Sequence, residues 1–138
     1  MIEIARTRRT SSASASLYFE RWCAIETHPE WAPSMEYFNL SEPFGAGAGG
    51  VLKTVGGQES PFRITTVGPG FVYADTTELD GAELTVHHEA VEGLDGTEVT
   101  LSAWVDGPGE AQLAREMSDE VQHSCERDLA ALAALLEG

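Results

Sequence analysis

The chain has few basic residues. It contains 8 Lys and Arg against 23 Asp and Glu, so that its 138 residues carry a formal net charge of −15. An excess of negative charge repels phosphate groups, which argues against nucleic acid and anionic membrane surfaces as partners. The charge does not identify a positively charged partner, because it also serves solubility.

Long apolar runs are also missing. No secretory signal is visible and no stretch approaches the length that spans a membrane, so we expect no membrane insertion. The only two cysteines, Cys23 and Cys125, lie far apart and lack the spacing of metal ligands. We interpret them as reduced, buried, small apolar residues of a cytoplasmic protein.

Motifs for cofactors, metals and nucleophilic catalysis are absent as well. Residues 45–50 are rich in glycine, but no Gly-Lys-Ser/Thr follows them, so a phosphate loop is excluded. Their glycines better suit a bend or bulge that lets a sheet curl. The four histidines lack metal-site spacing, and no Ser-His-Asp or Gly-x-Ser-x-Gly arrangement occurs. We therefore predict neither a cofactor nor a metal.

The strongest pattern that is present lies at the C-terminal end. Apolar residues recur there at steps of three or four, which predicts a helix over residues 108–136 with Asp106 as a possible cap. The second half is dense in Leu and Ala, whereas the first half is sparsely apolar. The repeating residues are Leu113, Met117, Val121, Cys125, Leu129, Leu132 and Leu136. Such a helix suits the lid of a cavity, or it simply covers a solid sheet.

The rest of the chain alternates short extended segments with Gly, Pro and Asp turns. We expect a first strand over residues 2–10, a helix over 13–25 and at most a helical turn over 30–32. Six strands follow, over residues 35–40, 51–55, 62–67, 71–77, 84–91 and 97–105. Strands in a run with segregated helices predict an α+β fold in a single domain, residues 1–138, with a curved seven-stranded antiparallel sheet around the last helix.

This order of elements resembles the START-like, helix-grip superfamily (SRPBCC), in particular its polyketide cyclase/dehydrase and lipid-transport branch. The resemblance covers essentially the whole chain. The segments that carry it are Thr27-His28-Pro29-Glu30-Trp31-Ala32-Pro33, Gly45-Ala46-Gly47, Pro61-Phe62-Arg63, Pro69-Gly70, His87-His88-Glu89, Asp95-Gly96-Thr97 and Gly107-Pro108. The resemblance implies a cavity between sheet and helix that takes a hydrophobic small molecule, and it leaves open whether a reaction occurs there.

Two polar positions are candidates for chemistry in such a cavity. The more apolar set in residues 84–91 includes His88, which would turn that histidine inward and leave His87 and Glu89 in solvent. If Tyr73 faces the same way, a hydroxyl and an imidazole could shuttle a proton during an aldol-type cyclisation. Alternatively, His88 is a buried histidine satisfied by a backbone carbonyl, and Tyr73 belongs to ordinary sheet packing.

The candidate ligand-binding residues are the aromatic and apolar side chains expected at the mouth or on the inward faces. They are Trp22, Trp31, Met35, Tyr37, Phe62, Ile64, Val86, Leu101, Met117 and Val121. Those near the short helices could grip a flat ring, or they could only seal the helices to the sheet. Trp104 falls on the outward face of its strand, which is unusual for so large a ring.

Three hypotheses follow. The leading one is binding of a hydrophobic, lipid or polyketide-like small molecule, by a monomer or a homodimer. The second is a cofactor-free polyketide cyclase or aromatase in which His88 and Tyr73 act as acid and base. The third is a protein-interaction or dimerisation module that uses Trp104 or the mouth aromatics. An internal cavity supports the first two, and a filled interior with an exposed aromatic patch supports the third.

Overall fold

The structure, a computed structural model, describes all 138 residues and confirms the α+β architecture. Seven antiparallel strands form one sheet, in the order β1-β7-β6-β5-β4-β3-β2. In chain order the elements are β1 (Ile2–Ser11), α1 (Ala15–Cys23), the 3₁₀ helix η1 (Ile25–Glu30), β2 (Met35–Leu40), β3 (Gly49–Thr54), β4 (Glu59–Gly68), β5 (Val72–Leu79), β6 (Ala82–Gly93), β7 (Gly96–Asp106) and α2 (Glu110–Glu137).

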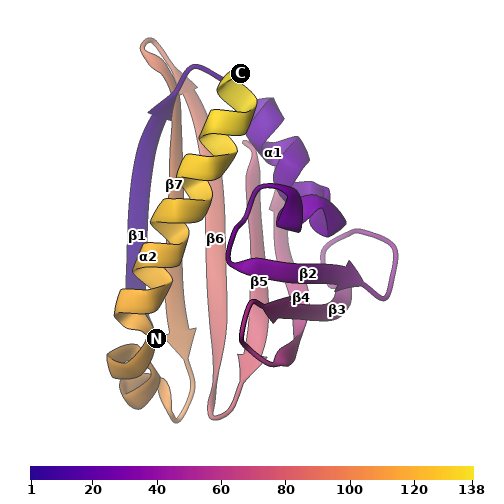
Figure 1. Cartoon of the computed structure of the whole chain (residues 1–138), viewed down its shortest axis with the longest axis vertical. Helices are drawn as coiled ribbons and strands as arrows, with labels where there is room; N and C mark the ends of the chain where they lie inside the picture. The colour runs from indigo at the N-terminus through magenta and orange to yellow at the C-terminus, as the bar shows by residue number, and fades with distance from the viewer.

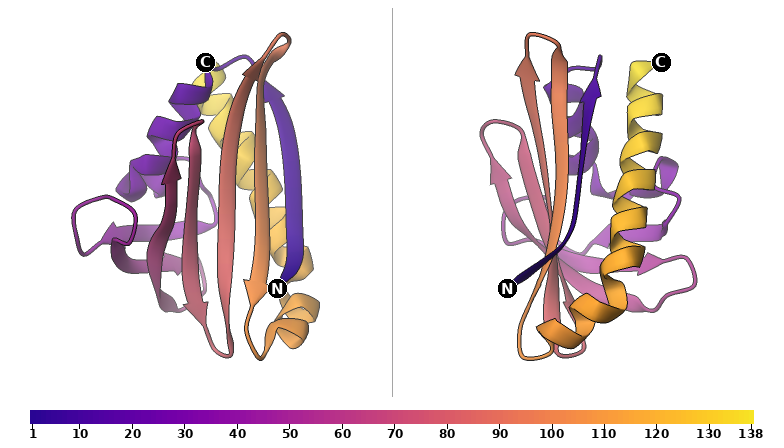
Figure 2. Two further views of the ribbon diagram at one scale, coloured as in Figure 1. Left: turned by 180° about the vertical axis from the view of Figure 1, so that it is seen from behind. Right: turned by 90° about the vertical axis from the view of Figure 1, so that its left-hand side faces the viewer.

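The helices lie on one face of the sheet. Figure 1 shows α2 running along β1 and β7, while the short strands β2 and β3 lie at the other edge of the sheet and run across the view. The two views of Figure 2 show the opposite face of the sheet free of helices. The sheet therefore curls around one side only, and the space between its concave face and α2 is the place where a cavity can form.

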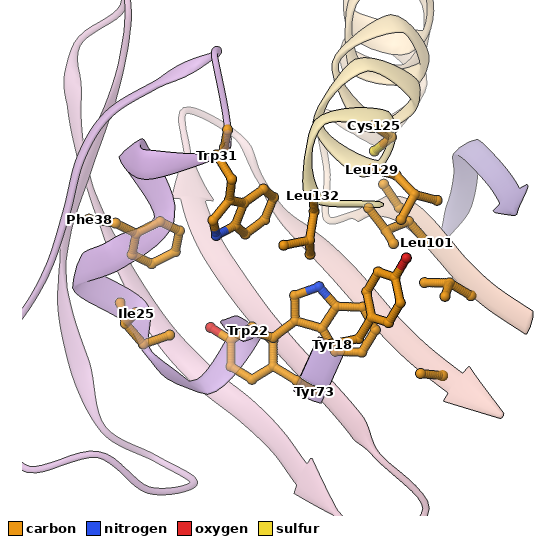
Figure 3. Packing of buried hydrophobic residues seen from close by; sticks show 14 of the residues in the cluster. Tyr18, Trp22, Ile25, Trp31, Phe38, Tyr73, Leu101, Cys125, Leu129 and Leu132 are labelled. Carbon is orange, nitrogen blue, oxygen red and sulfur yellow. The ribbon is translucent and has the colours of Figure 1, made fainter. Parts of the chain in front are cut away.

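Every expected strand is present, and most differ only at their ends. The first helix is shorter than expected, because the chain leaves α1 at Cys23 and continues as η1, which contains Pro29. In α1 the buried residues Ala15, Tyr18 and Trp22 share one face at helical spacing. Figure 3 shows Tyr18 and Trp22 pointing toward Leu129 and Leu132 of α2, so α1 and the last turns of α2 share one core.

The start of α2 corrects one expectation. Asp106 ends β7 and does not cap the helix, which begins two residues later than expected with Gly109 at the N-cap position and no side-chain cap. The cause is the turn at Gly107, whose backbone has φ +142°. The Glu110 carboxylate accepts a hydrogen bond from the backbone N–H of Gly107 at 3.4 Å and another from the N-terminal amine at 2.7 Å.

The glycine-rich segment before β3 supports a close approach between strands. A Cβ atom placed on Gly50 would lie 2.0 Å from the carbonyl oxygen of Asn39 in β2, a distance that no side chain tolerates. Gly50 therefore serves the close pairing of β2 with β3, and no register shift falls at this residue to mark the bulge that the sequence suggested.

The two halves of α2 pack differently. Leu129, Leu132 and Ala133 in the second half are buried, whereas in the first half Leu113, Met117 and Val121 are only partly buried. The structure thus has the firm and sparse halves that the sequence indicated. No helix of the chain combines the length and the hydropathy needed to cross a membrane.

Candidate functional site

A cavity of about 690 Å³ lies between the concave face of the sheet and α2. This volume falls in the range of small-molecule sites, roughly 300–1,000 Å³. Its apolar wall combines residues from the helices, the middle strands and β2. The apolar lining includes Trp31, Met35, Phe38, Leu84, Val86, Leu101, Met117, Val121 and Cys125.

The mouth of the cavity lies where its lining residues are exposed to solvent. Glu120, His123 and Arg127 of α2 form one side of it, and Thr54 and Val55 at the end of β3 form the other. Val55 leaves 68% of its surface exposed, which is much for an aliphatic side chain beside a pocket. The opening therefore lies between the middle of α2 and the β3–β4 turn.

One hydrogen bond joins α2 to the loop before β2 at the cavity wall. The Ser34 hydroxyl donates to Asp128 Oδ2 at 2.7 Å. The second carboxylate oxygen of Asp128 is buried without a partner, and burial raises the pKa of Asp128, although the bond from Ser34 opposes the shift. Asp128 therefore ties α2 to the rim of the cavity through one carboxylate oxygen, while its other oxygen accepts no hydrogen bond.

The inner end of the cavity is polar. Asp75 lines it with only 5% of its surface exposed, and the Tyr73 hydroxyl donates to Asp75 Oδ2 at 2.8 Å. Burial raises the pKa of Asp75 to about 7, because the bond from Tyr73 compensates only part of the lost hydration. Burial raises the pKa of Tyr73 well above the usual value for tyrosine, and the neighbouring Asp75 carboxylate adds to this shift.

Two neutral histidines complete this inner end. His88 Nδ1 donates to the carbonyl oxygen of Tyr73 at 3.1 Å, and His28 Nδ1 donates to the carbonyl oxygen of Ile25 at 3.2 Å. Burial lowers the pKa of His28 to about 4 and that of His88 to about 3, the latter with a further contribution from His28. Because Nδ1 carries the proton in each ring, Nε2 is left as an acceptor.

Aromatic rings hold both histidines in place. The ring of His88 lies 5.2 Å from that of Trp22 and 5.3 Å from that of Tyr73, measured between centroids. His28 lies 4.7 Å from both Trp31 and Phe38. These contacts fix the ring orientations, so the polar inner end is built on packed side chains.

Seven of the twelve candidate residues line the cavity. They are His88, Trp31, Met35, Val86, Leu101, Met117 and Val121. His88 faces inward as the alternation in β6 indicates, while His87 lies on the outer face with its ring 6.1 Å from Trp104. The unusual outward tryptophan is thus partly covered by a stacked histidine.

The other five candidates do not line the cavity, which corrects the expected placement. Tyr73, Trp22, Phe62 and Ile64 are inside the protein but form a layer behind the wall, within the hydrophobic core. Tyr73 in particular turns its hydroxyl to Asp75, so its contact with a ligand would pass through that carboxylate.

Tyr37 is misplaced for a different reason. The pairing of β2 with β3 shifts register between Met35 and Tyr37, which is the signature of a bulge. Strict alternation would bring Met35 and Tyr37 to the same face, but the extra residue turns Tyr37 outward, where it donates to Glu59. Phe38 takes the inward position, which period-two reasoning could not assign to it.

Sequence pattern does not single out His28 or Asp128, although both line the cavity. His28 sits in the motif around Pro29, and its only distinguishing signal was that motif. Asp128 lies one turn after Cys125 on α2, where a carboxylate among exposed charges gives no signal of its own. No group of three or more His, Cys, Asp or Glu side chains is arranged to hold a metal ion.

Comparison of the chain with protein-family models and with curated proteins finds no match. Solved structures do match. The structure titled Ara h 8.0201 has a TM-score of 0.76 and 16% identity over 95% of both chains. The di-domain ARO/CYC StfQ from the steffimycin biosynthetic pathway has a TM-score of 0.75 and 10% identity over 96% of this chain and 49% of its own.

A STAR-related lipid transfer protein from Xanthomonas axonopodis has a TM-score of 0.71 and 13% identity over 96% of this chain and 85% of its own. At such low identities the likeness shows the fold alone. The chain has the helix-grip fold that these structures share, which confirms the fold that the sequence resemblance implied.

Proposed function

We propose that the protein binds a hydrophobic small molecule, lipid or polyketide-like, in the cavity between the sheet and α2. The observation that carries the proposal is the cavity of about 690 Å³ whose wall is formed by Trp31, Phe38, Leu101 and Met117. A space lined by such side chains releases water when an apolar ligand enters, which favours binding. The names of two similar structures, a lipid transfer protein and an ARO/CYC, support this class of ligand.

The test is to fill the cavity with a larger side chain on α2. Val121→Trp places an indole in the space, whereas Val91→Trp makes the same change at an exposed site on β6 and serves as the control. Native mass spectrometry of protein purified from its own host would look for a co-purifying molecule. We expect a bound apolar species on the wild type and on Val91→Trp and its loss from Val121→Trp. Equal occupancy of both variants would contradict the proposal.

The second candidate function is a cofactor-free polyketide cyclase or aromatase. The observation in its favour is that His88 and Asp75 face the cavity from adjacent strands. In this mechanism His88 Nε2 would take a proton from the carbon next to a ketone, and protonated Asp75 would donate to the oxygen of the acceptor carbonyl. Tyr73 would act by positioning Asp75 and would not touch the substrate.

The electrostatics favour binding over catalysis. A histidine whose pKa is lowered to about 3 is a weak general base near neutral pH, because efficient proton transfer requires a pKa near the working pH. His88→Ala separates the two functions: under the cyclase hypothesis a poly-β-keto thioester analogue still binds but turnover is lost. Turnover by His88→Ala equal to that of the wild type would remove His88 from the mechanism.

The hypothesis of an interaction module loses its main support, because the interior is hollow and Trp104 stacks on His87. We infer that the protein acts in a reducing cytoplasm, which suits its two free cysteines. Cys125 faces the cavity, and burial raises its pKa to about 11, which keeps it an unreactive thiol.

A further inference from the structure

The polar inner end of the cavity has a composition that selects the head group of the ligand. Three side chains there, Asp75, His88 and His28, are each more than nine-tenths buried and face the cavity. Asp75 Oδ2 is used by Tyr73, and Oδ1 has no hydrogen-bond partner in the protein. The Nε2 atoms of both histidines are likewise free to accept, because each Nδ1–H is used by a backbone carbonyl.

These acceptors lie close enough to serve one ligand group. In the β5–β6 ladder Asp75 is paired with Val86, so His88 is its diagonal neighbour on the same face of the sheet. Diagonal pairs in an antiparallel sheet are separated by roughly 7–8 Å, which a single polar head between them can bridge. His28 approaches the same end from η1.

No cation faces this group of acceptors. Arg127 is the only lysine or arginine of the cavity wall, and it is exposed at the mouth. The net charge of −15 adds a negative potential over the whole molecule. A carboxylate or phosphate at the inner end would therefore lose its hydration and meet acceptors and a carboxyl group in return.

We propose that the ligand enters head first and carries a hydrogen-bond donor, an amine or a hydroxyl, which Asp75 and the two histidines accept, and that ligands with an anionic head are rejected. This inference rests on the proposed binding function and specifies its ligand class. Two other polar groups belong to this wall. Thr77 both donates and accepts and is compatible with either head, and the Trp31 indole N–H, buried without a partner, is one donor against the three acceptors. The apolar body of the ligand then lies along Phe38, Leu101 and Met117 toward the mouth.

An amine and a hydroxyl differ in how they use Asp75. An ammonium group pairs with the ionised carboxylate and supplies the positive charge that the cavity lacks. A hydroxyl donates to Oδ1 or to a histidine without needing the charge. Replacing Asp75 by the isosteric Asn removes the charge and retains an oxygen that can accept from Tyr73, so the two heads respond differently to this change.

The test is calorimetric titration with four naphthalene probes that share one ring system: 2-methylnaphthalene, 2-naphthalenemethanol, 2-naphthylmethylamine and 2-naphthoate. The wild type is expected to bind the alcohol or the amine at least tenfold more tightly than the naphthoate. If the amine is the preferred head, Asp75→Asn weakens it about tenfold and changes the alcohol less than threefold. If the hydroxyl is preferred, the alcohol binds at least as tightly as the amine in the wild type.

The control variant is Asp119→Asn, which removes the same charge from an exposed position on α2 and should change none of the affinities. Naphthoate binding as tight as that of the amine and the alcohol would overturn the inference while leaving the proposed function intact. Failure of all four probes, including the hydrocarbon without a head, would instead overturn the proposed function and the inference with it. The comparison of heads on the wild type does not depend on how Asp75→Asn folds.

Discussion

The side-chain amide of Gln122 pairs with the backbone of Arg6 in the way that a neighbouring strand would. Its Oε1 accepts from the Arg6 N–H at 2.8 Å, and its Nε2 donates to the Arg6 carbonyl oxygen at 2.9 Å. β1 is an edge strand, so these backbone groups have no strand partner on that side. The pair joins the sparse half of α2 to the sheet at a point where few apolar contacts do so.

Removing this pair should loosen the lid. We expect Gln122→Ala to lower the free energy of unfolding by about 1 kcal/mol, since two partly exposed hydrogen bonds are lost. The amide of Arg6 should exchange with deuterium faster in native conditions. Gln112→Ala is the matched control, because Gln112 bonds only to Glu116 on the same helix. Unchanged exchange at Arg6 in Gln122→Ala would show that the pair does not hold α2.

The buried carboxyl group of Asp75 should make stability depend on pH. Its pKa in the folded protein is about 7, above the ordinary value of 3.8, so the folded state binds more protons than the unfolded state between these values. The neutral form of Asp75 therefore stabilises the folded protein fully below about pH 4. This stabilisation is lost as pH rises from about 4 to 7. With 1.36 kcal/mol for each pKa unit, the loss is at most about 4 kcal/mol.

His28 and His88 act in the opposite direction. Their pKa values of about 4 and about 3 lie below the ordinary 6.5, so the stability they contribute is complete above pH 6.5 and falls as the solution is acidified. Asp75→Asn should therefore gain stability relative to the wild type as pH rises from 4 to 7, because both proteins retain the histidines. Thermal unfolding at half-unit pH steps measures this difference. A difference that stays constant across the range would contradict the buried, partly neutral state of Asp75.

The unequal halves of α2 predict unequal costs of truncation. Leu132 is fully buried against the core, so Leu132→Ala should reduce the free energy of unfolding by about 3 kcal/mol through a new internal void. Met117 borders the existing cavity, so Met117→Ala enlarges a space that is already present and should cost roughly 1 kcal/mol or less. Denaturant titration of both variants gives the comparison. Equal losses would mean that the sparse half of the helix is packed as firmly as the other.

The contact between Ser34 and Asp128 predicts a change at the rim. Ser34→Ala leaves both oxygens of Asp128 without a partner, one of them already being buried and unpaired. We expect a loss of about 1–3 kcal/mol. Asp128→Ser removes the carboxylate and with it the penalty for burying that group. This change should lower the free energy of unfolding less in the Ser34→Ala variant than in the wild type. Additive losses in the double variant, by thermodynamic cycle, would show that the two side chains are not coupled.

The sequence was sufficient to predict the order of elements, because each strand of the meander carries its own alternation and its own turn residues. Met35–Leu40 was predicted with the bounds the structure gives, and His88 was turned to the correct face. The firm and sparse halves of α2 could also be read from the spacing of its apolar residues. These features are local, so tertiary contacts did not have to be known.

The site was less predictable, because it depends on contacts between elements. Alternation separates inward from outward residues, but it does not distinguish a side chain on the cavity wall from one behind it, as Phe62 and Ile64 show. A bulge reverses alternation at one residue, as at Tyr37. The hydrogen bond from Tyr73 to Asp75 joins two residues on one face of β5, which alternation brings together, whereas the approach of His28 leaves no signal in spacing because it depends on how separate segments meet.

The bulge in β2 has a consequence for protein engineering. Glu36 is the additional residue, because Met35 and Tyr37 pair with the consecutive residues Thr54 and Lys53. Deleting Glu36 would restore strict alternation while Tyr37 stays outward and Phe38 stays inward, so the wall of the chamber should survive a backbone that is one position shorter.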